Sequence, residues 1–310
     1  MDRRCRLHPF FQLLNPAVNY LIYLAHGPAA IKYEALYSLL TYFDVAPAPL
    51  ATVLVYTDTP DVFQQVLGDR ADILYPAVTA DQWQAWRGAA DMVYLLKIGV
   101  LEHAAAHYPG NLLFTDTDTI WQRDPTPIFA QIAQGTRFMH LNEGVMRTGN
   151  LLSRKVYRRL QGREFVVGTS RVRIGPDTPL YNSGIIGFQS QDAALLRDIT
   201  PLADQLYAAY NKHMMEQLAT GLRLGLDSPL REAAPYVLHY WNLKAIRPAL
   251  MRVFEQSANQ GLPALRRHLD ALDIAGQHTA ELTYRNRPGW QRTLLKLVGR
   301  QWRIADPDGK

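Results

Sequence analysis

The sequence predicts a mixed α/β protein, with a mainly parallel sheet flanked by helices and a helical extension at the C-terminal end. Two observations predict this class. Short apolar runs of strand length alternate with segments of helical periodicity between residues 18 and 115. After residue 248 the strand-like runs stop, and the rest of the chain is helical and basic. We therefore expect a main domain over residues 1–248 and an extension over residues 249–310.

The amino-terminal part of the chain is expected to build the parallel sheet. Residues 18–25 form a continuous run of apolar, aromatic and β-branched side chains, which is typical of a buried strand. Residues 29–43 then place Ile31, Ala35 and Leu39 at helical spacing. The same alternation continues along the chain. Further strands are predicted at residues 51–56, 72–75 and 112–115, and further helices at residues 61–67, 81–87 and 90–108.

The second part of the main domain is less regular in sequence. A short helix at residues 129–134 and a strand at residues 137–141 precede a basic stretch, residues 144–173, for which we expect irregular structure. A polar loop at residues 181–184 then runs directly into an apolar strand. Two helices are predicted at residues 193–210 and 212–224, and a last strand at residues 236–241.

Composition limits the class of protein. The chain has 310 residues, of which 48% are hydrophobic and 20% charged, enough for a sizeable core. The sequence has one cysteine, Cys5, so no internal disulfide can form and a reducing compartment is expected. The N-terminus lacks the pattern of a signal peptide, and no run approaches the roughly 20 apolar residues of a spanning helix. We expect a cytoplasmic protein, either free or peripheral on the inner face of a membrane.

The overall charge favours anionic partners. The net charge of +5 suits nucleotide diphosphates or acidic lipid without choosing between them. Nucleic acid is not expected, because the basic residues are spread out and no recognised binding motif is present.

The chemistry of the chain centres on two carboxylates at the end of a predicted strand. Asp116 and Asp118 follow the apolar run at residues 112–115, and residues two apart in a strand point to the same face. Open α/β sheets usually hold their ligands at the carboxyl ends of the strands. A divalent cation relieves the repulsion between two such charges, so the pair predicts a metal site that grips a diphosphate. A solvated, Asp-rich turn is the alternative.

Four segments in this order resemble the nucleotide-sugar glycosyltransferases of the GT-A fold, most closely the retaining enzymes of glycosyltransferase family eight. Residues 116–118 (DTD) are similar to the DxD motif, and residues 181–184 (YNSG) to the loop that opens the acceptor-side strand. Residues 216–217 (EQ) are similar to an Asp-Gln pair of that family, and residues 239–244 (HYWNLK) to its late histidine-aromatic-lysine segment. The resemblance covers residues 18–248 and implies a GT-A fold, that is, a Rossmann-like nucleotide-diphospho-sugar transferase domain.

The resemblance also implies an activity and a cofactor. It implies a hexosyltransferase-type enzyme that moves a sugar from a nucleotide-diphosphate donor, with a UDP-sugar favoured, to a glycan or lipid-linked acceptor, with retention. It implies Mn²⁺ or Mg²⁺ as the cofactor, held by Asp116, Asp118 and His239. For His239 the alternative is an ordinary buried histidine whose hydrogen bonds are satisfied within the core.

Further donor-binding candidates come from the resemblance and from strand-end positions. Lys97 and Lys244 are expected to meet the donor phosphates, beside the metal-binding Asp116. The alternative for each lysine is an exposed or snorkelling side chain. Tyr56 and Asp58, at the end of a predicted strand, are candidates for recognition of the base or ribose, although a plain turn also explains that segment.

The last group of candidates faces the sugar. Asn182 and Ser183 are expected to hydrogen-bond sugar hydroxyls, with Gly184 allowing close backbone approach. Gln217 matches the family position that faces the anomeric carbon, but its amide is a poor nucleophile. Glu216 has a carboxylate, which can bind the sugar or act as a base. For residues 182–184 the alternative is a common turn before a strand. For Glu216 it is a glutamate that the helix dipole favours at a helix N-terminus.

The C-terminal segment predicts a basic amphipathic helix. On a 100° wheel the apolar residues of this segment fill one broad arc and the basic residues the opposite one. The apolar arc holds Trp290, Leu294, Leu295, Leu297, Val298, Trp302 and Ile304, and the basic arc Arg292, Lys296, Arg300 and Arg303. Such a helix suits an anionic membrane surface, in which case a lipid-linked acceptor is expected. The alternative is that the apolar face packs on the main domain.

Two other functions fit parts of the sequence. Residues 114–119 also resemble the first motif of haloacid-dehalogenase-type phosphatases, in which Asp116 would be the nucleophile and Asp118 the acid/base. In those enzymes this motif usually lies on the first strand, whereas several strand–helix units precede it here. A non-catalytic sugar-nucleotide-binding protein, or a membrane-tethered interaction protein, is the other alternative.

Overall fold

The computed structural model describes residues 18–89 and 91–305. Cys5 and the amino-terminal segment lie outside the described residues, and so do the start of the helix predicted at residues 90–108 and the last five residues.

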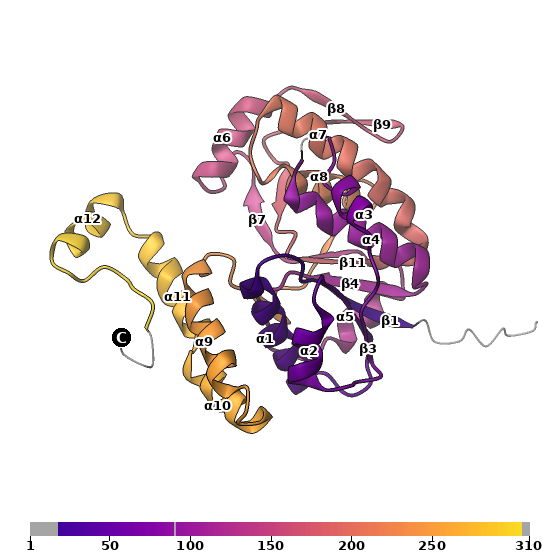
Figure 1. The fold of residues 1–310 in the computed structure, drawn as a ribbon. Helices are drawn as coiled ribbons and strands as arrows, with labels where there is room; N and C mark the ends of the chain where they lie inside the picture. The colour runs from indigo at the N-terminus through magenta and orange to yellow at the C-terminus, as the bar shows by residue number, and fades with distance from the viewer. Residues whose placement is uncertain (1–17, 90, 306–310) are drawn as a thin grey trace, which may run out of the picture.

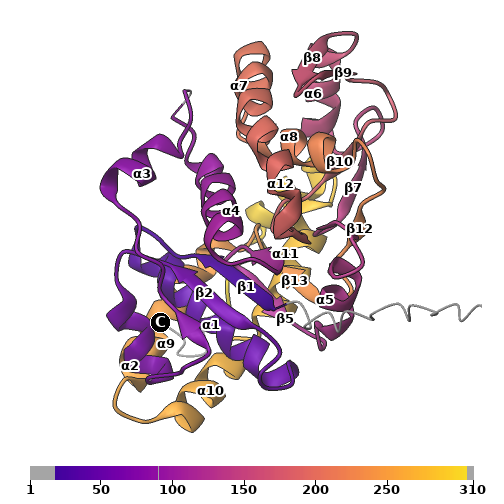
Figure 2. The ribbon, with the colours of Figure 1, turned by 90° about the vertical axis from the view of Figure 1, so that its right-hand side faces the viewer.

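A seven-stranded sheet with the strand order β12-β6-β11-β4-β1-β2-β3 forms the centre of the molecule (Figures 1 and 2). β4, β1, β2 and β3 run parallel, β11 is antiparallel to both β4 and β6, and β12 is parallel to β6. The strands are β1 (Asn19–Leu24), β2 (Thr52–Tyr56), β3 (Ile73–Leu74), β4 (Asn111–Thr115), β6 (Phe138–Met139), β11 (Ile185–Gln189) and β12 (Arg231–Glu232). The predicted mixed, mainly parallel sheet is confirmed.

The described residues form twelve α-helices, most of which cover the two faces of the sheet. They are α1 (Ala29–Val45), α2 (Pro60–Leu67), α3 (Ala80–Ala85), α4 (Leu96–His107), α5 (Thr126–Ile132), α6 (Leu151–Leu160), α7 (Ile199–Ala209), α8 (Met215–Leu224), α9 (Arg247–Ser257), α10 (Leu262–Ala271), α11 (Ile274–Arg285) and α12 (Gly289–Leu297). α1, α9 and α10 lie on one face, and α4, α7 and α8 on the other (Figure 2).

The alternation of side chains along each strand explains the two layers. Leu21 and Tyr23 of β1 belong to the core that includes α1 and α9, whereas Ile22 between them belongs to the core that includes α4 and α8. β4 divides in the same way, with Leu113 on the first side and Phe114 on the second. Successive strand residues point to opposite faces, so a continuously apolar strand is stable only when both faces are covered.

Three parts of the chain differ from the sequence predictions. The segment predicted as one helix at residues 193–210 is a 3₁₀ helix at Ser190–Asp198 followed by α7. The helix predicted at residues 90–108 begins at Leu96, after a single 3₁₀ turn at Val93–Leu95, because Gly88 and Asp91 adopt positive φ angles of 68° and 50° that turn the chain. Residues 144–173, expected to be irregular, hold α6, the end of β7 (Asn142–Val145) and a hairpin of β8 (Glu164–Val167) and β9 (Ser170–Arg173).

Residues 144–173 do contain helix and strand patterns, which are difficult to recognise in the sequence among the many basic residues. The Asn150 side chain caps α6 by accepting from the backbone N–H groups of Leu152 and Ser153, and Val156 and Leu160 are buried one turn apart. Phe165 and Val167 alternate with exposed residues along β8, as expected for a strand with one buried face.

The C-terminal part is helical, as predicted, but the amphipathic helix is shorter than the wheel assumed. α12 ends at Leu297, so Trp302 and Ile304 do not share its apolar face; they pack against the core beside α9 and α10 instead. Gly299, with a φ of 70°, follows the last turn, and such a residue terminates a helix. Among the described residues, no helix has the length and hydrophobicity needed to cross a membrane.

Candidate metal centre and the surrounding pocket

Asp116 and Asp118 lie in a tight turn between β4 and the short strand β5 (Thr119–Trp121). The turn is fixed on both sides: the Asp116 N–H donates to the Gly184 carbonyl at 2.7 Å, and the Thr119 hydroxyl donates to the Asp116 carbonyl at 2.8 Å. This places both carboxylates at the carboxyl end of a central parallel strand.

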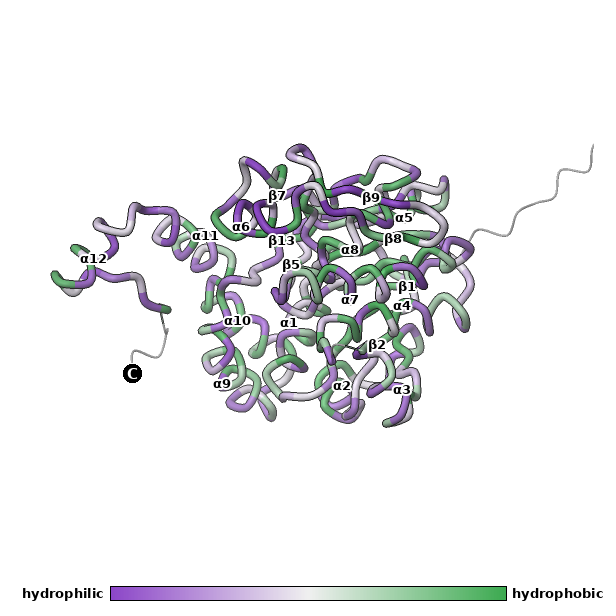
Figure 3. Tube along the Cα trace, turned by 90° about the horizontal axis from the view of Figure 1, so that it is seen from above, coloured by the Kyte–Doolittle hydropathy of each residue, from purple (hydrophilic) through white to green (hydrophobic). Residues whose placement is uncertain are grey.

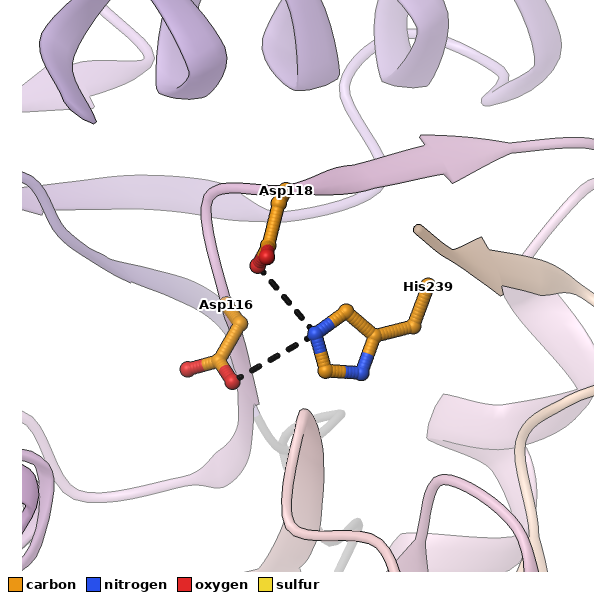
Figure 4. Close-up of side chains that lie close together, drawn as sticks. All are labelled: Asp116, Asp118 and His239. Carbon is orange, nitrogen blue, oxygen red and sulfur yellow. Dashed lines mark hydrogen bonds and ion pairs between the residues drawn. The ribbon is translucent and has the colours of Figure 1, made fainter. Parts of the chain in front are cut away.

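His239 reaches the carboxylates from a second small sheet. It ends β13 (Val237–His239), which pairs antiparallel with β5 so that His239 lies opposite Thr119. Its Nε2 atom lies 3.1 Å from Oδ1 of Asp118 and 3.7 Å from Oδ2 of Asp116 (Figure 4). One ligand atom from each of these three residues falls within 4.8 Å of the others. Two carboxylates and an imidazole at this separation form a suitable ligand set for a divalent cation.

Hydrogen bonding fixes which nitrogen of His239 faces the carboxylates. The Nδ1–H donates to Oδ1 of Asn182 at 2.9 Å, and the same oxygen accepts from the Gly184 N–H at 2.9 Å. The Asn182 amide nitrogen donates to Glu143 at 3.1 Å, so this orientation of the amide satisfies all of its partners. This bond turns Nε2 toward Asp116 and Asp118. The two carboxylates outweigh burial and raise the pKa of His239, so Nε2 carries a proton toward Asp118 here, and loss of that proton would present the Nε2 lone pair to a cation. A metal-binding histidine needs this arrangement, and the residues present fit the cofactor that the resemblance implies.

Gly184 is required beside this histidine. A Cβ atom at position 184 would lie 2.2 Å from Nδ1 of His239, so any other residue would displace the imidazole. The close approach of a sugar to the backbone at Gly184 stays a prediction.

Two lysines balance the carboxylates. Lys244 Nζ lies 2.6 Å from Oδ2 of Asp118. Burial alone would raise the pKa of Asp118, but His239 and Lys244 outweigh it and hold the pKa far below its usual range. Asp118 thus stays ionised at the bottom of the site.

Lys97 is almost fully buried at the start of α4. Its Nζ atom lies 3.3 Å from Oδ1 of Asp116, 3.2 Å from the Ser183 carbonyl and 3.9 Å from Oε2 of Glu216. Burial lowers the pKa of Lys97, but the nearby carboxylates raise it by more, so the net pKa lies above its ordinary value. A buried lysine that remains charged here is a fixed cation beside the candidate metal site, and it does not snorkel.

Glu216 and Gln217 lie in the first turn of α8. Glu216 is buried and accepts from the Ser183 hydroxyl at 3.1 Å and the Thr220 hydroxyl at 3.0 Å. Burial raises the pKa of Glu216 and outweighs the effect of Lys97. Gln217 donates its amide N–H to Oε2 of Glu143 at 3.2 Å.

All of these groups line one pocket of about 320 Å³. The sequence-predicted residues that the structure brings to its wall are Lys97, Asp116, Asp118, Asn182, Ser183, Gly184, Glu216, Gln217, His239 and Lys244. The wall also includes Tyr94, Glu143, Asn150, Leu152, His213, Met214 and Trp241.

Tyr56 and Asp58 lie outside this wall. The Tyr56 ring is buried and its hydroxyl pairs with Nδ1 of His103 at 2.9 Å. Asp58 pairs with Lys32 at 2.9 Å and accepts from the Gly27 N–H at 3.3 Å. The predicted contact of these two residues with a base or ribose stays a prediction.

Glu143 was missed by the sequence reasoning. Its two carboxylate oxygens accept from Asn182 and Gln217, so it joins the His239 side of the pocket to the start of α8. It belongs to β7, within the part of the chain whose sequence shows no clear periodicity, and no local motif marks it.

No protein-family model and no curated protein matches the sequence. Solved structures of similar fold include the galactosyltransferase LgtC in complex with donor and acceptor sugar analogues, with a TM-score of 0.47 and 12% identity over 78% of this chain and 96% of that chain. An active-site mutant of LgtC gives a TM-score of 0.43 and 13% identity, covering 66% of this chain and 69% of that chain.

Mouse xyloside xylosyltransferase 1, in its apo form, gives a TM-score of 0.46 and 11% identity over 69% of this chain and 85% of that chain. With TM-scores below 0.5 and identities of 11–13%, these structural matches do not indicate the activity of this protein.

Proposed function

We propose that this protein is a metal-dependent glycosyltransferase that uses a nucleotide-diphosphate sugar as donor. The convergence of Asp116, Asp118 and His239 beside two lysines, at the carboxyl end of a central parallel strand, carries the proposal. Acidic and imidazole ligands would hold Mn²⁺ or Mg²⁺, and the metal would supply Lewis-acid stabilisation of the departing diphosphate.

The lysines give the site its preference for an anion. Lys97 is buried and Lys244 is half exposed at the pocket wall, and both lie within 3.4 Å of a carboxylate of the candidate metal pair. Bound diphosphate oxygens would meet these two positive charges directly. The two lysines would thus orient the donor and neutralise charge that develops on its leaving group.

The part of the wall next to Lys97 suits a sugar. Ser183, Glu216, Glu143 and Gln217 place hydroxyl, carboxylate and amide groups around the same cavity, which is the chemistry that recognises sugar hydroxyls. Gln217 is proposed to face the anomeric carbon, with Glu143 fixing the direction of its amide. A UDP-sugar donor, a glycan or lipid-linked acceptor and retention of configuration complete the proposal; these three points rest on the resemblance alone.

The proposal is tested by donor binding with and without metal. Thermal-shift measurements across nucleotide sugars should reveal one donor that stabilises the protein only when Mn²⁺ is present. Asp118→Asn should abolish this metal-dependent stabilisation and leave the melting temperature of the free protein near that of the wild type. Asp227→Asn is the matched control, because Asp227 is an exposed aspartate that pairs with Arg223 outside the pocket. Unaltered donor binding by the Asp118→Asn variant would contradict the proposal.

Turnover separates the alternatives. Transfer or slow hydrolysis of the bound donor supports the glycosyltransferase. Metal-dependent binding without turnover of any donor would indicate a sugar-nucleotide-binding protein, and a phosphoaspartate trapped at Asp116 would indicate the phosphatase.

A further inference from the structure

The apolar side of α12 is open to solvent. The exposed fractions of Trp290, Leu294, Leu297 and Val298 are 68%, 54%, 79% and 58%. Trp290, Leu294 and Leu297 are four and three positions apart and therefore lie on one side of α12, and Val298 directly follows its last residue. α12 stands at the edge of the molecule, away from the central sheet, in both the front and the top views (Figures 1 and 3).

The chain that follows α12 is anchored to the rest of the fold. Trp302 and Ile304 pack against the core beside α9 and α10. Gln277 of α11 fixes the returning chain through two hydrogen bonds to the backbone of Ala305, at 3.0 and 2.9 Å. α12 therefore lies between α11 and a C-terminal segment that returns to the core.

The same segment is strongly basic. Residues 286–305 contain no aspartate or glutamate. Their charged residues are Arg287, Arg292, Lys296, Arg300 and Arg303, and all five are exposed. Arg292 and Lys296 fall on the side of the helix wheel opposite the four exposed apolar side chains, which leaves those side chains free to enter an apolar phase.

We infer that this face of α12, here called the docking face (Trp290, Leu294, Leu297 and Val298), binds the surface of an anionic lipid bilayer. The apolar side chains would enter the boundary between headgroups and acyl chains, while the flanking basic residues meet lipid phosphates. Pairing with a second copy of the chain is the less favourable use of this face. A symmetric contact would bring two sets of uncompensated positive charges together.

The helix that precedes α12 contacts the rim of the pocket. Arg285, in the last turn of α11, donates to the Asn242 carbonyl at 3.4 Å, and its guanidinium lies 5.9 Å from the ring of Trp241, a pocket-lining residue. A bilayer bound through α12 would therefore lie on the side of the molecule to which α11 and the rim of the pocket contribute.

The test is co-sedimentation of the full chain with lipid vesicles. We expect binding to vesicles of phosphatidylcholine mixed with phosphatidylglycerol, much weaker binding to phosphatidylcholine alone, and release by high salt. The variant Trp290→Ser/Leu294→Ser/Leu297→Ser should lose affinity by about tenfold or more, because it removes most of the docking face. The variant Arg292→Gln/Lys296→Gln/Arg300→Gln should lose affinity by about a hundredfold, since each basic residue near an anionic surface contributes about fivefold.

Two controls keep the test specific. Leu262→Ser removes an exposed leucine of similar character from α10, away from the docking face, and should bind like the wild type. Asp118→Asn should also bind vesicles normally, so the result is independent of the proposed activity. Circular dichroism confirms that each variant is folded.

Three results would overturn the inference. They are wild-type binding by the triple apolar variant, equal binding to neutral and anionic vesicles, and a wild-type dimer in sedimentation velocity that the apolar variant converts to a monomer. The last result would assign the face to a second copy of this chain.

Discussion

At the scale of single residues, Asn182 determines what His239 can do. Because its amide oxygen accepts from Nδ1 of His239 at 2.9 Å, the other ring nitrogen is the one that faces Asp116 and Asp118. The same amide donates to Glu143, so one side chain connects the candidate metal ligands to the sugar side of the pocket.

This role predicts the effect of Asn182→Ala on metal affinity. Loss of the amide frees the imidazole to rotate or to change tautomer, and partners of metal-binding histidines typically contribute about 10- to 100-fold in affinity. Calorimetric titration with Mn²⁺ alone should therefore show weaker binding of about that size. Asn286→Ala, at an exposed position after α11, serves as the control. Equal Mn²⁺ affinity in the Asn182→Ala variant would separate Asn182 from the metal site.

The residues of the site were predictable to different degrees. Asp116 and Asp118 could be predicted because they directly follow an apolar run of strand length, which neighbouring residues alone reveal. The contact of His239 with this pair could not be derived from spacing, because it depends on the pairing of β13 with β5 across more than a hundred residues; the family resemblance supplied it. Glu143 was missed because its position beside Asn182 and Gln217 arises only from tertiary packing.

At the scale of elements, an ion pair with a buried carboxylate joins the C-terminal helix α9 to α1. Glu34 of α1 is fully buried and receives two hydrogen bonds of 2.9 Å from the guanidinium of Arg247, at the start of α9. Burial raises the pKa of Glu34, although Arg247 acts to lower it. The carboxylate therefore depends on its partner for stabilisation.

Removal of that partner should destabilise the fold. Arg247→Met leaves Glu34 buried and unpaired, which is expected to lower the free energy of unfolding by about 3 kcal/mol, the low end for a buried pair because Arg247 is 29% exposed. Urea denaturation measures the change. The double variant Glu34→Met/Arg247→Met should recover much of the loss, and a single variant as stable as the wild type would show that the pair contributes little.

Elements with strong local patterns were predicted well, and the others were not. β1, β2 and α1 carry apolar runs or a clear helical period, and their observed bounds differ from the predicted ones by no more than two residues. The hairpin of β8 and β9 has only Phe165, Val167 and Val172 buried among basic residues, so its alternation is masked by charge. The C-terminal amphipathic helix was predicted too long because a helical wheel assumes a continuous helix and cannot show that the chain turns at Gly299.

At the scale of the whole molecule, two hydrophobic cores lie on the two faces of one sheet. The candidate metal site lies where β4 of that sheet leads into the small sheet of β5 and β13. Any ligand that binds only the folded protein there should stabilise the molecule as a whole. Mn²⁺ at about 100 times its dissociation constant is expected to add about 2.7 kcal/mol to the free energy of unfolding. Denaturation with Mn²⁺ and with EDTA measures this difference, and Asp118→Asn should remove it. The same stabilisation in that variant would place the metal elsewhere.

The most direct test of the central claim is the position of the bound cation. Crystals grown with Mn²⁺ and a nucleoside diphosphate should show an anomalous difference peak within coordination distance of the Asp116 and Asp118 carboxylates and Nε2 of His239, with diphosphate oxygens near Lys97 and Lys244. A diphosphate bound in the pocket with no manganese peak between these three side chains, or a peak at another position, would contradict the claim.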